Sequence, residues 1–290
     1  VFEIDGNDVA QIRTAIEAAQ KVVGKPTLII GRCIMGKGAL KADGSSYERS
    51  CKTHGAPLGG DAYVNTVKNL GGDPENPFVI FDDVKEIYTK RAAELEAIAA
   101  ERHAEEEEWA KANPEMAAKQ AQWFSGNAPV VDWSGLTQKD DAPTRNASAA
   151  CLGILAEQVP NMICSSADLC NSDKTDGFLN KTKNLVAGDF SGGFLQAGVA
   201  ELTMACCCIG MALHGGIIPA CGTFFVFSDY MKPAIRMAAL MELPVKFVWS
   251  HDAFRVGEDG PTHEPVEQEA QVRLMEKVKN HSGRNSMLVL

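Results

Sequence analysis

The sequence predicts an α/β protein with a mostly parallel sheet flanked by helices, and three observations support this class. In the second half of the chain, short apolar runs alternate with stretches of helical spacing, which is typical of parallel strands joined by helices. The chain of 290 residues is long enough for two domains with sizeable cores. Its hydrophobic content of 45% and charged content of 23% are those of an ordinary globular protein.

The first part of the chain predicts helices around one short strand. Asp8 precedes apolar residues at helical spacing and is expected to cap a helix. Residues 27–30 form a short apolar run that predicts a strand. Asp82 begins a long pattern of helical spacing, and Asn113-Pro114 starts a further helix. We therefore interpret this part as the helical end of a second α/β domain.

The second part predicts alternating elements after a polar linker at residues 125–141. Strands are expected at residues 162–164, 217–221, 245–249 and 287–290, and helices at residues 144–155, 198–213, 230–241 and after Pro265. Because the chain begins at Val1 and stops within an apolar run, it is expected to be a piece of a longer protein. Its two parts, residues 1–125 and residues 126–290, are then incomplete domains.

The loop after residues 245–249 is the strongest candidate site. Titratable side chains follow the strand closely, with glycine and proline between them: His251, Asp252, Asp259 and His263. In open α/β sheets, ligands bind beyond the carboxyl ends of the strands. This position favours a binding site over the alternative, which is a solvated turn.

A second candidate site combines a carboxyl group with aromatic rings. Glu201 is the only acid in a long apolar helical stretch, and Phe224, Phe227 and Tyr230 follow the strand at residues 217–221. A carboxyl group beside an aromatic slot suits a heteroaromatic ring that carries a nitrogen. The alternatives are a core glutamate with a local donor or at a helix start, and aromatic residues that only fill the core.

Composition and spacing argue against several other classes of protein. The formal net charge of −10 disfavours nucleic acid and anionic membranes as partners, and no apolar run reaches the ~20 residues of a membrane span. The glycine-rich stretch from Gly31 to Gly38 differs from a nucleotide-binding P-loop, which requires Ser or Thr where Gly38 stands. The nine cysteines form no CxxC pair and predict the reduced thiols of an intracellular protein.

Several motifs resemble the transketolase family. They follow the family's order at comparable spacings and cover nearly the whole chain: Thr53-His54-Gly55-Ala56-Pro57-Leu58-Gly59, Thr144-Arg145-Asn146-Ala147-Ser148, Ser166-Ala167-Asp168-Leu169, Gly222-Thr223-Phe224-Phe225-Val226-Phe227, Val248-Trp249-Ser250-His251-Asp252 and Glu258-Asp259-Gly260-Pro261-Thr262-His263-Glu264-Pro265. The resemblance implies a thiamine-diphosphate-binding fold. Residues 1–125 would be the end of the diphosphate-binding domain with a helical linker, and residues 126–290 the pyrimidine-binding domain.

The resemblance implies roles for residues on the cofactor side. Glu201 matches the catalytic glutamate that hydrogen-bonds N1′ of the aminopyrimidine ring of thiamine diphosphate. Asp168 matches an aspartate near the thiamine in the dimer interface. Three aromatic residues match the pocket that holds the pyrimidine ring: Phe224, Phe227 and Tyr230.

The resemblance also implies roles on the substrate side. Arg145 and Ser172 match groups that bind the phosphate of a sugar phosphate, and a planar guanidinium suits that ligand. His54 matches a loop histidine near the cofactor diphosphate and the reacting centre. Three residues match groups that contact sugar hydroxyls, the cofactor or the substrate carbonyl: His251, Asp259 and His263. His54 and His263 are expected to join Glu201 in catalysis.

The chain departs from the family pattern in three places. Ala200 and Leu202 stand where Arg and His often flank the glutamate, so no proton relay through these neighbours is implied. Cys170-Asn171 replaces the common Thr-Pro before Ser172. The magnesium and diphosphate signature, Gly-Asp-Gly with a downstream Asn, is absent. The Mg²⁺ ligands are therefore expected outside this chain, and the chain alone is expected to be inactive.

Together the motifs predict transketolase activity, the transfer of a two-carbon ketol unit from a ketose phosphate to an aldose phosphate. The resemblance implies the pentose phosphate pathway, a cytoplasmic homodimer with its active site between subunits, and no nucleic-acid or membrane partner. One alternative is another thiamine enzyme such as deoxyxylulose-phosphate synthase, against which Arg145 and Ser172 argue. The other is a non-catalytic pyrimidine-domain subunit, which would have no use for Glu201.

Overall fold

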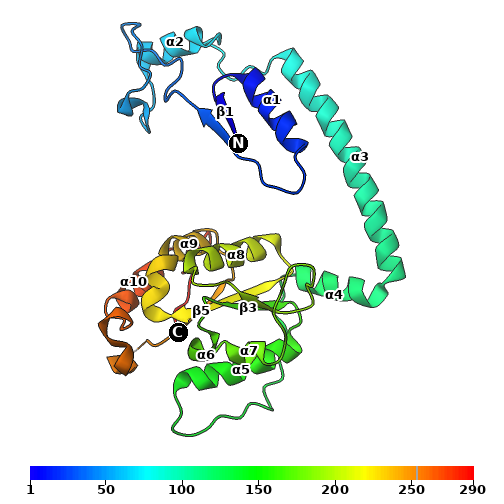
Figure 1. Cartoon of the computed structure of the whole chain (residues 1–290). Helices are drawn as coiled ribbons and strands as arrows, with labels where there is room; N and C mark the ends of the chain where they lie inside the picture. The colour runs from blue at the N-terminus through cyan, green and yellow to red at the C-terminus, as the bar shows by residue number, and fades with distance from the viewer. Residues whose placement is uncertain (253) are drawn as a thin grey trace. The chain divides into compact units, whose positions relative to one another are not determined.

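The structure, a computed structural model, describes residues 1–252 and 254–290, apart from the side chains of Phe254, Arg255 and Glu258 (Figure 1). It forms two compact units, Val1–His103 and Ala104–Leu290. The division falls within the long helix α3 (Asp82–Ala112). Each unit is described by itself.

A two-stranded parallel sheet begins the first unit. β1 (Phe2–Asp5) pairs with β2 (Ile29–Arg32), and α1 (Val9–Gln20) connects them. The Asp8 carboxylate accepts hydrogen bonds from two backbone N–H groups of the first turn of α1. This confirms the expected helix cap, which satisfies donors that a helix leaves unpaired at its start.

The glycine-rich stretch of the first unit is not a phosphate loop. The backbone N–H of Gly38 donates to the Glu48 carboxylate at 2.8 Å, so this donor already has an acceptor within the protein. Turns follow Gly38 instead of a helix, and the next helical segments are η1 (Cys51–Thr53) and α2 (Gly60–Asn69).

The sheet of the second unit has four parallel strands in the order β4-β3-β5-β6. Their bounds are Met162–Ser166 for β3, Phe194–Gln196 for β4, Ile218–Phe224 for β5 and Lys246–Ser250 for β6. In the register of the two central pairs, Ser166 lies opposite Gly222 and Phe224 lies opposite Ser250. The carboxyl ends of β3, β5 and β6 therefore meet at one edge of the sheet, which confirms the predicted fold class.

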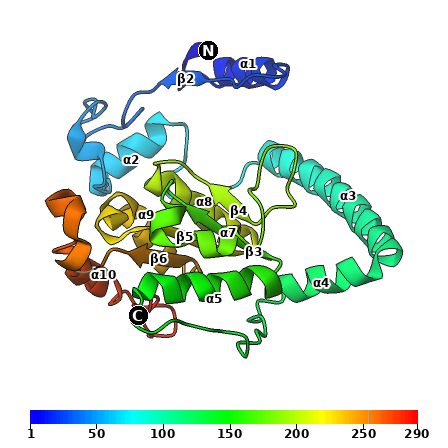
Figure 2. The same ribbon diagram turned by 60° about the horizontal axis from the view of Figure 1, so that its bottom comes forward.

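Helices cover both faces of this sheet (Figures 1 and 2). One face carries α8 (Glu201–His214) and α9 (Ser228–Leu240), and the other carries α5 (Thr144–Gln158) with the short helices α6 (Cys170–Asp173) and α7 (Asp176–Leu179). The remaining helical segments are α4 (Pro114–Phe124), η2 (Phe225–Phe227), η3 (Phe254–Thr262) and α10 (Gln268–Met275).

Two apolar clusters fill the space between the sheet and its helices. Met204, Met231 and Ile235 are fully buried on the side of α8 and α9. Phe178 and Phe194 anchor the cluster on the side of α5 and α7. All nine cysteines are free in the structure. In the part of the chain that the structure describes, no helix has the length and apolar character needed to cross a membrane.

Two expected elements differ from the structure. The helix expected at residues 198–213 begins at Glu201, because Gly198 has a φ of +71° and Ala200 a φ of −151°, neither of which is helical. The strand expected at residues 287–290 is not formed. Instead, the backbone of Val289 bonds to the side chains of Arg273 and Glu276. The predictions were wrong at both positions.

The close approach of α5 and α7 generates a test of the fold. A Cβ added at Gly177 would lie 2.7 Å from Cα of Ala149, a distance that real Cβ atoms do not adopt. Gly177→Ala should therefore lower the free energy of unfolding by about 1–3 kcal/mol, the usual cost of overpacking. Urea denaturation measures this change. Gly210→Ala, at an exposed position of α8 where a Cβ meets nothing within 4 Å, should be neutral or slightly stabilising.

Candidate functional site

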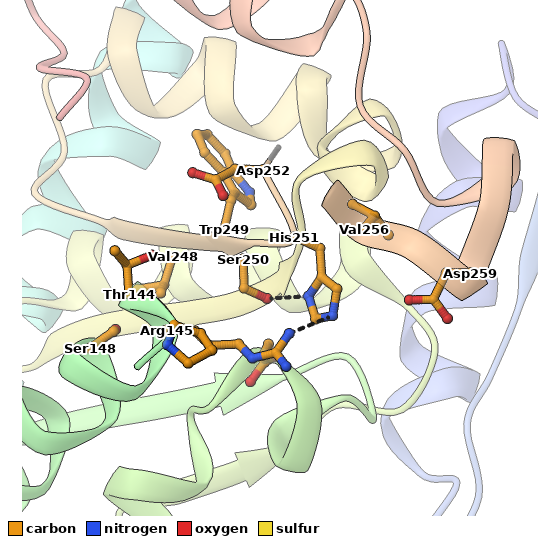
Figure 3. Close-up of a pocket in the computed structure, with 12 residues that line it drawn as sticks. Thr144, Arg145, Ser148, Val248, Trp249, Ser250, His251, Asp252, Val256 and Asp259 are labelled. Atoms are coloured by element: carbon orange, nitrogen blue, oxygen red, sulfur yellow. Dashed lines mark hydrogen bonds between the residues drawn. The ribbon is translucent and has the colours of Figure 1, made fainter. Parts of the chain in front are cut away.

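A cavity of about 470 Å³ lies at the end of β6, and we call it the Arg145 pocket (Figure 3). Its polar lining comes from four elements and from the residues after β6: Thr144, Arg145 and Ser148 of α5, Asp173 of α6, Ser250 of β6, Asp259 of η3, and His251 and Asp252. The pocket thus joins Arg145 to three residues of the predicted loop site, which are His251, Asp252 and Asp259.

Arg145 and Ser250 hold the His251 ring between them (Figure 3). Arg145 Nη1 donates to His251 Nε2 at 3.0 Å, and Ser250 Oγ lies 2.9 Å from His251 Nδ1. Arginine has no acceptor, so Nε2 must accept and the proton of the neutral ring must be on Nδ1, where it is donated to Ser250 Oγ. The two neighbours therefore specify one tautomer of a neutral imidazole.

The electrostatic surroundings of His251 favour the same neutral state. Burial lowers the pKa of His251, and the Arg145 guanidinium and His263 lower it further, against the opposite effect of Asp259 and Asp252. The unfolded chain takes up a proton at a higher pH than the folded protein does at this residue. His251 therefore makes the folded state less stable as the pH falls through the ordinary histidine range.

Asp173 is a buried carboxyl group in the wall of the same pocket. It accepts hydrogen bonds from Ser166 Oγ at 2.7 Å, Thr175 Oγ1 at 2.7 Å and Thr175 N at 2.8 Å. Burial raises its pKa, and these donors act in the opposite direction. The network ties the end of β3 to the α6–α7 segment and fixes the position of that wall.

A second cavity, also of about 470 Å³, contains the predicted carboxyl group, and we call it the Glu201 pocket. Glu201 is 7% exposed, and its Oε1 accepts a weak hydrogen bond from Thr223 Oγ1 at 3.5 Å. Apart from Thr203, the other lining residues are apolar or aromatic: Ala167, Leu169, Val199, Ala200, Leu202, Phe227 and Tyr230. One carboxyl group at the base of an apolar slot suits a flat ring with a nitrogen at one edge.

Stacked rings connect the two pockets. The Phe224 ring stacks on His251 with centroids 3.7 Å apart and lies parallel to Phe227 at 5.8 Å. His263 meets Phe227 edge-on at 5.3 Å, and Tyr230 lies 6.1 Å from Phe227. A continuous set of aromatic and imidazole rings therefore runs from the Arg145 pocket to the Glu201 pocket.

Three predicted site residues lie outside this assembly. His54 is exposed in the first unit, and its position relative to the two pockets is not determined. Asp168 is exposed with a φ of +65°, between two residues that line the Glu201 pocket. Ser172 is half-buried next to Asp173, but it does not line the Arg145 pocket.

Sequence reasoning missed three residues that shape the pockets. Ser250 could have been found, because it stands directly between the strand and His251. Thr223 lies in β5 and reaches Glu201 of α8, a contact that requires knowledge of the packing. Asp173 gave no signal, because the segment around it resembles an ordinary polar loop and only the fold shows that it is buried.

Comparisons with known proteins agree with this geometry. The family model described as the transketolase pyrimidine binding domain matches residues 140–285. The model described as the transketolase thiamine diphosphate binding domain matches residues 1–129. Both pockets lie within the part of the chain matched by the first model.

Individual relatives and solved structures give the same result. A probable transketolase of Streptococcus pneumoniae is 39% identical over 280 residues, which cover 93% of this chain and 41% of that protein. The Bacillus subtilis transketolase is 38% identical, with 93% and 40% covered. The chain therefore spans about two fifths of the length of these relatives.

Among solved structures, transketolase from Leishmania mexicana superimposes with a TM-score of 0.79 at 32% identity, over 94% of this chain and 40% of that one. A Pichia stipitis transketolase in complex with sedoheptulose-7-phosphate has a TM-score of 0.78 at 30% identity, over 94% of this chain and 42% of that one. These likenesses confirm the thiamine-diphosphate-binding α/β fold.

The contact between Arg145 and His251 generates a titration experiment. Arg145→Ala should raise the pKa of His251, because a cation hydrogen-bonded to Nε2 disfavours the imidazolium ion. Titration of the imidazole signals by NMR measures the pKa of His251. Lys181→Ala is a matched control, since Lys181 pairs with Glu157 and is not among the charges that act on His251. An unchanged or lower pKa in Arg145→Ala would show that Arg145 does not set the state of His251.

Proposed function

Because the chain belongs to the transketolase family, we propose that it contributes part of an active site that transfers a two-carbon ketol unit between sugar phosphates. The main support for this proposal is the row of rings from Phe224 to Phe227. It joins the Arg145 pocket to the Glu201 pocket at one edge of the sheet. A phosphorylated sugar requires a cation at one end and a reacting group at the other. The two pockets offer both.

The Glu201 pocket fits the aminopyrimidine ring of thiamine diphosphate. Its apolar lining suits the faces of the ring, and the exposed Tyr230 ring stands at its side. When bound, thiamine diphosphate supplies the nucleophilic carbon that takes up the two-carbon unit. Phe224, Phe227 and Tyr230 would hold the pyrimidine, as the sequence predicts.

Glu201 would hold a proton at the ring nitrogen that faces it. Its carboxyl group is fixed at the first residue of α8 with Thr223 as a donor, so its direction is set before a ligand enters. Ala200 and Leu202, its chain neighbours, carry no titratable group. Proton transfer at this end therefore depends on Glu201 itself.

Arg145 would bind the phosphate of the sugar. Arg145 lines the pocket and uses Nη1 for His251, and a guanidinium carries five N–H donors, so donors remain for an anion that enters the pocket. Ser172, next to Asp173 of the pocket wall, would add a hydroxyl.

The residues between the two ends would orient the sugar. His251 and Asp259 line the Arg145 pocket, and His263 lies against Phe227 on the way to the Glu201 pocket. The Asp259 carboxylate and the His263 ring suit the hydroxyls and the carbonyl of a ketose, whereas both nitrogens of His251 already bond to Arg145 and Ser250, so His251 would contact the sugar only by exchanging one of these bonds. His263, which lies against Phe227 of the Glu201 pocket, would act on the reacting carbonyl. His54 is proposed to act near the cofactor diphosphate, as the resemblance implies.

A second subunit would cover the Glu201 pocket. The exposed fractions are 79% for Val199, 62% for Tyr230 and 44% for Leu202. Monomeric proteins rarely expose large apolar surfaces of this kind to solvent. A homodimer with its active site between subunits fits this surface, with Asp168 in the contact.

We further propose a cytoplasmic enzyme of the pentose phosphate pathway, with domains at residues 1–125 and 126–290.

The proposal includes magnesium, with its ligands outside this chain. In residues 1–252 and 254–290, no cluster of three or more His, Cys, Asp or Glu side chains could hold a metal ion. Magnesium therefore remains part of the proposal as an ion bound by other residues, and no step is assigned to it.

The role of Glu201 is tested by a conservative variant. In a transketolase that carries this chain, Glu201→Gln should slow exchange of the thiazolium C2 proton by a factor on the order of 10² or more, because the amide cannot exchange a proton with the ring nitrogen. Quenched-flow exchange in D₂O with NMR detection measures the rate. Glu157→Gln, on an exposed ion pair of α5, is the control. Near-normal exchange in Glu201→Gln would remove Glu201 from the mechanism.

The phosphate role of Arg145 is tested by substrate choice. Arg145→Ala should weaken the binding of phosphorylated donor sugars by about 1.5–3 kcal/mol, the range of hydrogen bonds to charged groups. An unphosphorylated ketose should hardly be affected. Steady-state kcat/KM values for both donors measure the difference, with Arg236→Ala, at an exposed position of α9, as the control. Equal losses for the two donors would contradict the assignment.

A further inference from the structure

Gln268, the first residue of α10, is buried although the segment around it is exposed. It is 2% exposed, whereas Val266 is 83% exposed and Glu267 and Glu269 are also exposed. A polar side chain is buried in this way only where its donors and acceptors find partners. The position of Gln268 is therefore fixed by contacts and not by its place in the helix.

Three hydrogen bonds use the Gln268 amide. Its Oε1 accepts from Val266 N at 2.9 Å, and its Nε2 donates to Asp229 Oδ2 at 3.0 Å and to Glu267 Oε1 at 3.2 Å. A reversed amide would place its oxygen against two carboxylates and its NH₂ group against an N–H, so one orientation is specified. The amide thus closes the end of the loop and ties it to Asp229.

Asp229 is the helix-side partner in this contact. It lies in the first turn of α9, between Phe227 and Tyr230, which both line the Glu201 pocket. Lys232 Nζ lies 2.7 Å from its other carboxylate oxygen, so Asp229 is held within α9. Figures 1 and 2 show α10 beside α9, in agreement with this bond.

The bond connects the loop that carries His263 to the helix start that carries the ring wall. His263 lies five residues before Gln268 and meets Phe227 edge-on at 5.3 Å with an interplanar angle of 71°. Thr262 Oγ1 lies 2.8 Å from His263 Nδ1, a contact within the loop itself. Among the described contacts of residues 263–268, the Gln268–Asp229 bond is the hydrogen bond that reaches α9.

We propose that Gln268 and Asp229 are a positioning pair that sets His263 against Phe227 and so aligns it with the Glu201 pocket. The catalytic meaning of this alignment rests on the function proposed for His263, whereas the alignment itself does not. Neither side chain touches the pockets, so the pair acts through the loop and through the first turn of α9.

The test replaces the amide in two ways. Gln268→Glu places a carboxylate against Asp229 and Glu267, and Gln268→Ala removes all three bonds. In either variant, backbone hydrogen exchange in residues 256–267 should become at least about tenfold faster, because the end of the loop is released. The NMR signals of the His263 ring should shift. In a transketolase that carries this chain, kcat should fall roughly 10- to 100-fold with KM for the donor nearly unchanged.

A charge swap supplies the rescue. The double variant Asp229→Asn with Gln268→Glu reverses donor and acceptor, since the Asn amide can donate to the Glu carboxylate. It should move exchange, the His263 signals and kcat from the Gln268→Glu values toward those of the wild type, a non-additive result expected of side chains in contact, although the repulsion from Glu267 remains. Glu269→Gln, an exposed neighbour at 72% side-chain exposure, is the control and should match the wild type.

The outcomes separate this inference from the proposed function. Unchanged loop exchange and His263 signals in both single variants would overturn the positioning pair, even in an active enzyme. A swap that behaves like Gln268→Glu would also overturn it, because the bond to Asp229 would not be what positions the loop. If the wild type shows no transketolase activity, the exchange and NMR results still decide the pair, and only the proposed function fails.

Discussion

The site of the second unit depends on the register between β5 and β6. Phe224, the last residue of β5, lies opposite Ser250, so His251 leaves the sheet directly beside the Phe224 ring. A φ of +54° at His251, rare for a residue with a side chain, turns the imidazole onto that ring at 3.7 Å. A slip of one residue would send these side chains to the opposite face of the sheet. Both pockets would then lose the row of rings that connects them.

Gly222, two residues before Phe224 in β5, leaves room for the wall of the Arg145 pocket. A Cβ at Gly222 would lie 2.5 Å from Thr175 Cγ2 and 3.0 Å from Asp173 Oδ2. The buried network of Asp173, Ser166 and Thr175 therefore fits only above a residue without a side chain. The central strand carries a bulky ring at its end and a glycine two residues before it. The first builds the site, and the second leaves room for the wall of the Arg145 pocket.

The sequence was sufficient for the features that depend on local pattern. Alternating apolar runs located β3, β5 and β6, and the loop after β6 indicated His251, Asp259 and His263 because titratable residues followed a strand. In the first unit the sequence analysis missed β1, with four residues, and α2, with ten. In the second unit the missed strand and α-helices are short: β4 has three residues, and α6 and α7 have four each. Segments of one turn bury too little apolar surface to leave a periodic pattern, so tertiary contacts decide them.

The partners of the site residues could not be predicted for a different reason. Thr223 reaches Glu201 across 22 residues, Arg145 reaches His251 across 106, and Gln268 reaches Asp229 across 39. Each contact requires the packing of whole elements. The candidate site residues were visible in the sequence, whereas the groups that orient them became visible only in the fold.

The neutral state of His251 explains how a protein of net charge −10 can keep a local cation in the Arg145 pocket. If His251 were charged, it would repel Arg145, and the guanidinium could not remain at 3.0 Å from Nε2. A neutral ring instead accepts one N–H of Arg145 and holds the guanidinium in place without neutralising it. The full positive charge then remains in a partly desolvated pocket, where it acts on an anion more strongly than in water. Asp173, Asp252 and Asp259 line the same pocket, and the bond to His251 occupies one N–H of the guanidinium and fixes its position among these carboxylates.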